Sequence, residues 1–407
     1  MKSYLSHITC STSDDRLPID RPVNNTCPDG GIIECHYDIE RVRAEVTRDD
    51  IAAGPSSLWR YAPMLPAQDP ANAVTLGEGW TPMLRAPQLE KELGCTEIWI
   101  KDEGRNPSGT FKDRGATVAV SRFKELGIKT VVHNSSGNAG GSWALYCARA
   151  GIECVNLLAE DSLISSLQQS SLAGAKTYMV HGHWKHAGGM VQRAADAHGW
   201  FNCGTLKEPY RLEGKKTMGW EIAEQLGWEL PDVVFYPTGG GVGAIGIFKA
   251  FGEVEALKWL NGGNHTPRLV VTQYEGCAPL VKAFNEGKDE TVTWEDMNVL
   301  PGGLKSPKPP GDKEVLRTLR ETKGSAVAVS SEESIDAAKL LTRTEGIFPC
   351  PESATTLAGL LRALDDGSVK KDERIVLMIT GSGLKSIPNF PTPDLIPIEA
   401  GTDVPAN

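Results

Sequence analysis

The chain has 407 residues, of which 40% are hydrophobic and 23% are charged. This is the composition of an ordinary globular protein, and the length predicts two or three folding units of about 100–200 residues each. The net charge of -10 and the absence of a long basic stretch argue against nucleic acid as a partner. The least charged long stretch, Val233 to Phe248, is interrupted by glycines and a proline, so we expect no membrane span.

Cysteine usage and the N-terminal residues indicate a cellular compartment. The nine cysteines are scattered and include no CxxC pair, which predicts reduced thiols in a cytoplasmic protein. Met1 to Ser6 contain no apolar segment of the kind that a secretory signal needs. We therefore expect a cytoplasmic location.

Residues 1–75 differ from the remainder of the chain. Ser11 to Asn25 is polar and rich in turn residues, Asp38 to Asp50 is charged and predicted to be helical, and Pro63 to Pro70 is punctuated by prolines. We interpret this segment as an arm or cap that wraps on the main body. A partly disordered tail is the alternative.

From Glu97 onward, short apolar runs rich in β-branched residues alternate with helical patterns. Such runs are typical of parallel strands that are buried on both faces. The alternation predicts right-handed βαβ units in an open α/β sheet, whose sites lie at the carboxyl ends of the strands. The predicted strands are Glu97–Lys101, Thr130–His133, Glu153–Leu158, Lys176–Val180, Val233–Tyr236, Arg268–Gln273, Ala326–Val329 and Arg374–Ile379, and the predicted helices include Phe111–Leu126, Gly141–Ala150, Lys216–Leu226, Ile245–Leu260 and Ile335–Thr344.

Lys112 follows the first of these strands and opens a predicted helix. A lysine at such a turn can direct its amine into a crevice. Two glycine-rich turns, Ser135 to Gly141 and Thr238 to Gly243, also lie between a strand and a helix. An amine nucleophile beside an anion cradle is what a pyridoxal phosphate enzyme requires.

Thr238 to Gly243 is the predicted cradle for a phosphate group. Its four glycines let successive backbone N–H groups converge, and the following helix adds partial positive charge. A dinucleotide site requires GxGxxG, whereas the spacing here is GGGxG. A tight turn without a ligand is the alternative.

Two further turns carry polar groups that suit the same cofactor. The hydroxyl and N–H groups of Ser135 to Ala139 can bind a carboxylate, and the Asn138 amide can reach a phenolic oxygen; ordinary helix capping is the alternative. Thr380 ends the last strand, where a neutral hydroxyl suits a ring nitrogen; a simple turn is the alternative.

These motifs, in this order, resemble the fold-type-II pyridoxal phosphate enzymes, and among them the threonine synthases. The resemblance runs from Leu76 to Lys385 and rests on Leu76 to Pro82, Phe111 to Gly115 and Arg211 to Thr217. It implies two open, mostly parallel twisted sheets with helices on both faces, plus an N-terminal arm, in a homodimer. The implied divisions are a large cofactor-binding domain of residues 76–118 and 206–390, a small domain of residues 119–205 and a C-terminal tail of residues 391–407.

The resemblance also assigns roles to single residues. Lys112 would join the cofactor, pyridoxal 5'-phosphate, as a Schiff base. The other implied cofactor-binding residues are Phe111, Asn138, Gly239, Gly240, Gly241, Val242, Gly243 and Thr380. The implied substrate-binding residues are Ser135, Ser136, Gly137, Ala139, Arg211 and Lys216. The Arg211 guanidinium would bind a phosphorylated amino-acid substrate, because it matches phosphate with a bidentate fork.

The implied reaction converts O-phospho-L-homoserine and water to L-threonine and phosphate. Thr205 to Tyr210 and the glycine loop lack the asparagines that threonine synthases use for the substrate phosphate, and Lys207, Lys215 or Lys216 can substitute for them. The alternative is therefore a β-eliminating or β-replacing enzyme, similar to serine/threonine dehydratases or to a phosphoserine-using synthase, possible also in specialised metabolism. A non-catalytic relative is a third hypothesis.

No metal is expected. The arm resembles a zinc ribbon in which each CxxC pair has lost its second cysteine, leaving Cys10 and Cys27, with Cys35 nearby. We interpret His181, His183 and His186 as a loop cluster without a metal. Asn285 to Asp312 is predicted to be a long surface loop that can act as a lid.

Overall fold

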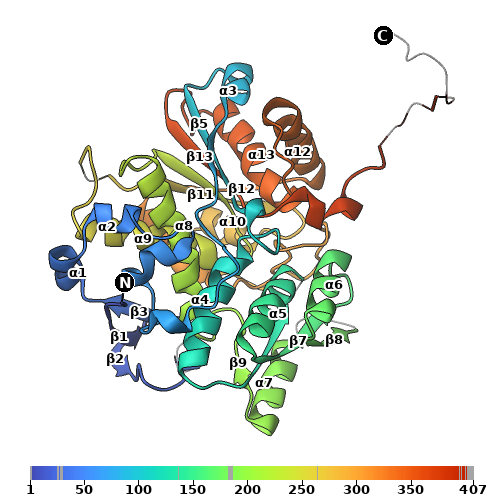
Figure 1. Ribbon diagram of the computed structural model, residues 1–407. Coiled ribbons are helices and arrows are strands. Elements are labelled where there is room, and N and C mark those ends of the chain that lie inside the picture. The colour runs from blue at the N-terminus through green and yellow to red at the C-terminus, as the bar shows by residue number, and fades with distance from the viewer. Residues whose placement is uncertain are drawn as a thin grey trace.

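The structure is a computed structural model that describes residues 2–24, 27, 31–135, 137–181, 187–263, 265–393, 395, 397–398 and 400. Its strands form three sheets, one in the arm and two in the main body. Both sheets of the main body carry helices on their two faces (Figure 1), so the predicted fold class is confirmed. The limits of the two domains remain predictions.

The larger sheet has six strands in the order β12-β11-β10-β13-β5-β4. All its pairings are parallel except that of β4 with β5. Successive residues of β10 face two separate cores: Val234 and Tyr236 face one core, while Val233 and Phe235 face the other. A strand buried on both faces has no polar side to display, which explains its continuous apolar sequence. The six strands are β4 (Met83–Arg85), β5 (Glu97–Asp102), β10 (Val233–Pro237), β11 (Arg268–Tyr274), β12 (Ser325–Val329) and β13 (Arg374–Ile379).

Helices cover the two faces of the larger sheet with different elements. One face carries α3 (Pro87–Leu93), α12 (Ser331–Glu345) and α13 (Pro351–Asp365). The other carries α8 (Tyr210–Gln225), α9 (Val242–Ala256), α10 (Pro279–Asn285) and α11 (Asp312–Glu321), with α4 (Lys112–Glu125) packed on α8.

The smaller sheet has four parallel strands in the order β8-β7-β6-β9. They are β6 (Thr130–Ser135), β7 (Glu153–Ala159), β8 (Lys176–Val180) and β9 (Phe201–Asn202). Helix α7 (Ala187–His198) packs on one face of this sheet, while α5 (Asn138–Ala150) packs on the other and against α6 (Ile164–Leu172). In Figure 1 these green elements lie below the larger sheet.

The predicted strands are confirmed within two residues at each end, but several helix limits differ. Helices α5, α9 and α12 begin at Asn138, Val242 and Ser331, three to four residues before their predicted starts. Helix α8 begins at Tyr210 and not at Lys216, because the Glu208 carboxylate accepts hydrogen bonds from the N–H groups of Tyr210 and Arg211 at 2.7 and 3.0 Å. Helix α9 ends at Ala256, before the predicted Leu260, since Lys258 adopts a left-handed conformation with φ of 59°. No helix or strand lies between α10 and α11, as predicted for Asn285 to Asp312.

The arm contains more regular structure than its sequence predicts. The polar segment near Ser11 belongs to a three-stranded antiparallel sheet of β1 (Leu5–Cys10), β2 (Ser13–Leu17) and β3 (Ile33–Tyr37). Instead of one helix over Asp38 to Asp50 there are two, α1 (Ile39–Glu45) and α2 (Arg48–Ala52), because Thr47 begins α2 with a capping box that it forms with Asp50. Buried arm side chains share a core with α8 and α9, which supports an arm wrapped on the main body.

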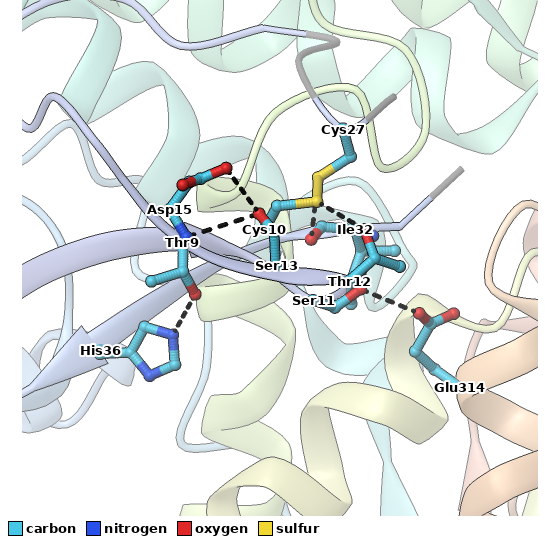
Figure 2. Close-up of a disulfide and its surroundings, with 10 residues drawn as sticks. All are labelled: Thr9, Cys10, Ser11, Thr12, Ser13, Asp15, Cys27, Ile32, His36 and Glu314. Carbon is cyan, nitrogen blue, oxygen red and sulfur yellow. Dashed lines mark hydrogen bonds between the residues drawn. A yellow bond between two sulfur atoms is a disulfide. The ribbon is translucent and has the colours of Figure 1, made fainter. Parts of the chain in front are cut away.

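The prediction of nine reduced cysteines is wrong for two of them. Cys10 and Cys27 form a disulfide (Figure 2), while the other seven cysteines are buried free thiols. The two cysteines are 17 positions apart in sequence, so no local pattern predicts the pair. Strand β1 carries Cys10 to the place where the chain returns with Cys27, and this proximity is a tertiary property.

No helix in the described ranges is long and apolar enough to cross a membrane.

Candidate active site

A cavity of about 530 Å³ opens where the carboxyl ends of the strands of the two sheets meet. The chain reaches it from β5, β6, β10 and β13, which are the strand ends that the sequence marks with Lys112 and the glycine-rich turns. The sequence-predicted residues that line it are Phe111, Lys112, Ser135, Asn138, Ala139, Arg211, Gly239, Gly240, Gly241, Val242, Gly243 and Thr380.

Lys112 is the first residue of α4, and its position is fixed by β13. The Phe111 N–H donates to the Thr380 carbonyl at 2.9 Å, so the start of α4 is tied to the end of β13. The Lys112 ammonium lies 4.5 Å from the centre of the Phe111 ring. The pKa of Lys112 is lowered to about 8 by burial and by Arg211, against an opposing effect of Glu352. About a tenth of this amine is therefore neutral and nucleophilic at pH 7.

The glycine loop forms a cradle that larger residues cannot reproduce. Gly241 precedes α9 with φ of 90°, a conformation that favours glycine. A Cβ atom at Gly243 would overlap the Tyr236 hydroxyl, and one at Gly239 would overlap the carbonyl of Gly303. Backbone N–H groups at the start of a 15-residue helix bind anions well. The loop therefore fits the phosphate of pyridoxal 5'-phosphate.

Hydroxyl groups surround the end of β13. The Thr380 side chain is 7% exposed, and its Oγ1 lies 3.1 Å from the Ser353 Oγ, which also accepts the Gly381 N–H at 3.0 Å. Thr380 lines the cavity and carries a neutral hydroxyl that Ser353 holds, and its pairing with a ring nitrogen stays a prediction.

In the turn from Ser135 to Ala139, part of the hydrogen-bonding capacity is used by the start of α5. The Ser135 Oγ accepts hydrogen bonds from the N–H groups of Gly137 and Gly140 at 3.0 and 3.1 Å, so it caps α5. Asn138 lines the cavity while its Oδ1 accepts from the Ser166 hydroxyl at 3.1 Å. Gly137, with φ of 133°, shapes the turn without being among the cavity-lining residues. Ser136 lies outside the described residues.

Arg211 reaches the cavity from the first turn of α8. Its Nη1 donates to the Thr205 Oγ1 at 3.1 Å, its Nη2 donates to the Cys203 carbonyl, and its guanidinium carbon lies 4.9 Å from the centre of the Trp143 ring. The Arg211 Nε lies 3.5 Å from a Glu208 oxygen. Burial raises the pKa of Glu208 to about 7, although Arg211 opposes this shift. These contacts hold the guanidinium at the cavity wall.

Lys216 does not line the cavity. Its ammonium is buried between Glu213 at 2.6 Å and Glu253 at 2.8 Å. Lys215 lines the cavity instead, and its Nζ donates to the Phe111 carbonyl. Residues four apart share a helix face, so Lys215 lies on the face of Arg211, whereas Lys216 is turned about 100° away. This helical spacing is the signal that could have selected Lys215 from the sequence.

The cavity also contains residues that sequence reasoning did not assign to the site. The loop between α10 and α11 contributes Lys305, which pairs with Asp161, and Lys308, which lies 2.9 Å from Asp312. Loop residues without a repeating pattern give no sequence signal for such positions. Lys207, which the sequence offers as a substitute ligand for a substrate phosphate, also lines the cavity. The other unassigned lining residues with polar side chains include Asn134, Asn202, Thr205, Tyr236, Thr293, Ser306, Cys350 and Glu352.

No group of three metal-ligating side chains occurs among the residues that the structure describes. Cys10 and Cys27 are joined to each other, which removes them as thiolate ligands. The exposed His181 pairs with Glu160 at 3.0 Å. His183 and His186 lie outside the described residues.

A lysine of lowered pKa, an anion cradle at a helix N-terminus and a neutral hydroxyl at a strand end share one cavity, which is the equipment of an enzyme that uses pyridoxal phosphate. The model of the family described as pyridoxal-phosphate dependent enzyme matches residues 74–381, and the chain belongs to this family. Its cofactor is pyridoxal 5'-phosphate.

Within that family the chain is similar to threonine synthases. It is 38% identical to the threonine synthase of Methanocaldococcus jannaschii over 88% of this chain and 88% of the relative. It is 32% identical to that of Methanosarcina acetivorans over 93% and 92%, and 33% identical to that of Mycobacterium tuberculosis over 85% and 94%. The protein is thus a pyridoxal-phosphate dependent lyase of the threonine synthase-like kind.

Solved structures support the fold. Maize serine racemase superposes with a TM-score of 0.63 at 20% identity, covering 74% of this chain and 88% of that one. An L-serine ammonia-lyase from Rhizomucor miehei superposes with a TM-score of 0.64 at 20% identity, covering 74% and 93%. At this identity the likeness concerns the fold alone.

Proposed function

We propose that the protein converts O-phospho-L-homoserine and water to L-threonine and phosphate. The observation that carries this proposal is that one cavity joins two cationic regions. One is Lys112 with the glycine loop, and the other lies around Arg211 and the loop lysines Lys305 and Lys308. The first suits the cofactor and the second suits a substrate that brings its own phosphate. The similarity to three threonine synthases over most of the chain supports the same substrate.

The cofactor, when bound, supplies an electron sink for carbanion chemistry at an amino acid. The backbone N–H groups of Gly239 to Gly243 would hold its phosphate, Thr380 would hold its ring nitrogen and Asn138 its phenolic oxygen. Lys112 would hold the cofactor in the resting enzyme. The Lys112 Nζ would act as the base at Cα of the substrate and, after it has released that proton, as the base at Cβ.

Arg211 binds the substrate phosphate in this proposal, together with the second cationic region. Thr205 fixes the guanidinium, and the indole of Trp143 supports its face. Ser135, Ser136, Gly137 and Ala139 surround the substrate carboxylate. The Ser135 oxygen and the Gly137 N–H already bond to each other, so the donors are the other N–H groups of the turn. The resulting enclosure keeps the departing phosphate on one side and the reacting carbons beside Lys112.

A β-eliminating or β-replacing enzyme, acting on serine, threonine or phosphoserine, is the second candidate. It is favoured by Thr205 to Tyr210, which carries no asparagine for a substrate phosphate, and its chemistry needs the same Lys112. The two candidates differ in the carbon that loses its substituent, so the products separate them.

The test is a substrate panel with the cofactor-loaded protein. Phosphohomoserine should yield equal amounts of phosphate and threonine, while phosphoserine should yield little phosphate and serine or threonine little ammonia. Ammonia from serine or threonine, or phosphate from phosphoserine at the higher rate, would refute the proposal in favour of the second candidate. Lys112→Ala should abolish both the visible absorbance of the bound cofactor and all product.

We further propose that the protein acts in the cytoplasm as a homodimer. The seven free cysteines support a reducing compartment, whereas the Cys10–Cys27 disulfide counts against one. Exposed apolar side chains on α6 and β8, among them Leu172 and Tyr178 at 88% and 55% exposure, support a surface that a second subunit covers. Light scattering of the purified protein should give twice the chain mass of 43.9 kDa; a single-chain mass at micromolar concentration would contradict the dimer.

A further inference from the structure

Glu352 is a buried carboxyl group that the proposed reaction leaves without a role. It is the second residue of α13, its side chain is 4% exposed, and it lines the cavity. Its Oε1 accepts the Gly303 N–H at 3.0 Å, while its Oε2 has no hydrogen-bond partner in the described part of the chain. Leaving a buried carboxyl oxygen without a hydrogen bond costs free energy, so such a group usually has a functional role in its site.

The surrounding backbone holds this carboxyl in place. The Cys350 N–H donates to the Gly381 carbonyl at 2.9 Å, which ties the start of α13 to the end of β13 beside Thr380. On the other side, a Cβ atom at Gly302 would overlap the Glu352 Oε1, so the loop between α10 and α11 follows the carboxyl closely. The position of Glu352 is therefore fixed by α13 and its tie to β13 on one side, and by the loop between α10 and α11 on the other.

Charge gives the carboxyl its significance. Glu352 is the one acidic residue among the described residues that line the cavity. Six cationic side chains line the same cavity, namely Lys112, Lys207, Arg211, Lys215, Lys305 and Lys308. Some of these have acidic partners outside it, as Lys305 has Asp161 and Lys308 has Asp312. Inside the cavity, a proton added to Lys112 meets positive neighbours and one carboxyl.

We propose that Glu352 is a positioning residue for Lys112: its carboxylate is the internal counter-charge that allows the Lys112 amine to keep a proton in a cavity lined by cations. Arg211 lines the cavity from α8 and disfavours the ammonium form of Lys112, while Lys112 in turn disfavours the ammonium form of Lys215. Glu352 faces it from α13 and favours that form, while Cys350 and Tyr274 are the uncharged titratable neighbours of Glu352. The inference rests on the proposed role of Lys112 as the base.

The direction of the effect follows from these signs. Burial and Arg211 lower the pKa of Lys112, and Glu352 raises it. An uncharged residue at position 352 removes the opposing contribution, so the pKa of Lys112 must fall. A nearby opposite charge typically shifts a pKa by about one unit or more. A base whose pKa falls accepts the substrate proton less readily.

The experiment measures Lys112 directly in the full-length protein from which the cofactor has been removed. Trace labelling with acetic anhydride between pH 6 and 10, followed by peptide mass spectrometry, gives the fraction of neutral amine at position 112. Glu352→Gln keeps the shape and the hydrogen bond from Gly303 but removes the charge, and should move the midpoint down by about one pH unit. Glu352→Asp keeps the charge and should stay closer to the wild type.

Glu314→Gln is the matched control, because Glu314 is a buried carboxyl on α11 that faces Ser11 and does not line the cavity. An unchanged or raised midpoint in Glu352→Gln, or an equal shift in Glu314→Gln, overturns the proposal. Should Glu352→Gln fail to fold by circular dichroism, Glu352→Met decides, because it removes the charge without burying a polar amide. Its midpoint must lie below that of the wild type by about one pH unit, and an unchanged or raised midpoint overturns the proposal. The labelling needs neither cofactor nor substrate, so it stays independent of the substrate panel.

Discussion

Replacing Gly243 by alanine tests whether the glycine loop must remain free of side chains. The three atoms nearest to a Cβ at Gly243 all belong to Tyr236: the hydroxyl and Cζ would overlap it, and Cε1 would lie at 3.1 Å. Tyr236 is 2% exposed, and its ring meets the Phe111 ring edge-on at 6.2 Å between centres. The ring cannot turn aside without displacing Phe111 beside Lys112, so the loop itself must move.

The expected magnitude follows from this overlap. Inserting a methyl group into a closely packed site typically costs about 1–3 kcal/mol. If the displaced loop carries this cost, the cofactor binds about 5- to 150-fold more weakly. The assay is a titration of the cofactor-free protein with pyridoxal 5'-phosphate, followed by visible absorbance, with urea unfolding as a second measurement. Binding as tight as in the wild type would refute the steric argument.

Two variants sharpen this test. Gly252→Ala lies in the same helix, is exposed and has nothing within 4 Å of the added Cβ. It should leave cofactor binding unchanged and stabilise the protein by up to about 1 kcal/mol through helix propensity. The double variant Gly243→Ala with Tyr236→Leu removes the overlapping ring atoms and should recover part of the lost affinity. If the affinity for the cofactor does not recover, the loss in Gly243→Ala is not caused by the overlap with Tyr236.

Three further predictions concern other parts of the molecule. Arg211→Ala should raise the KM for phosphohomoserine at least about tenfold, since charge-assisted hydrogen bonds contribute about 1.5–3 kcal/mol each, while cofactor affinity stays within about threefold; equal losses in both would contradict a role at the substrate phosphate. Burial lowers the pKa of His133 to about 3, so its contribution to stability is present above pH 6.5 and is lost as the pH falls. The free energy of unfolding therefore declines between pH 7 and 5, and His133→Asn should remove about 2 kcal/mol of this decline. An unchanged decline in the variant would refute this. Thiol titration of the denatured protein should find seven thiols before reduction and nine afterwards, and eight without reductant in Cys10→Ser; nine thiols before reduction would exclude the disulfide.

The sequence alone predicted the main body of the fold and the centre of the site. Apolar runs such as Val233–Tyr236 mark strands because a strand buried on both faces cannot carry polar residues. Lys112 and the glycine loop are recognisable because a strand-to-helix turn is a local structure with its own chemical requirements. Parallel strands place all such turns at one edge of the sheets, and this is why separate motifs could be expected to share a cavity.

The tertiary structure decided which side chains meet across long separations. Lys216 pairs with Glu253, 37 positions away, because the packing of α8 on α9 brings the two side chains together. The Cys10–Cys27 disulfide and the approach of Gly303 to Glu352 join residues that share no local pattern. A repeating pattern in the sequence determines one element at a time, whereas a contact between elements depends on how all of them pack.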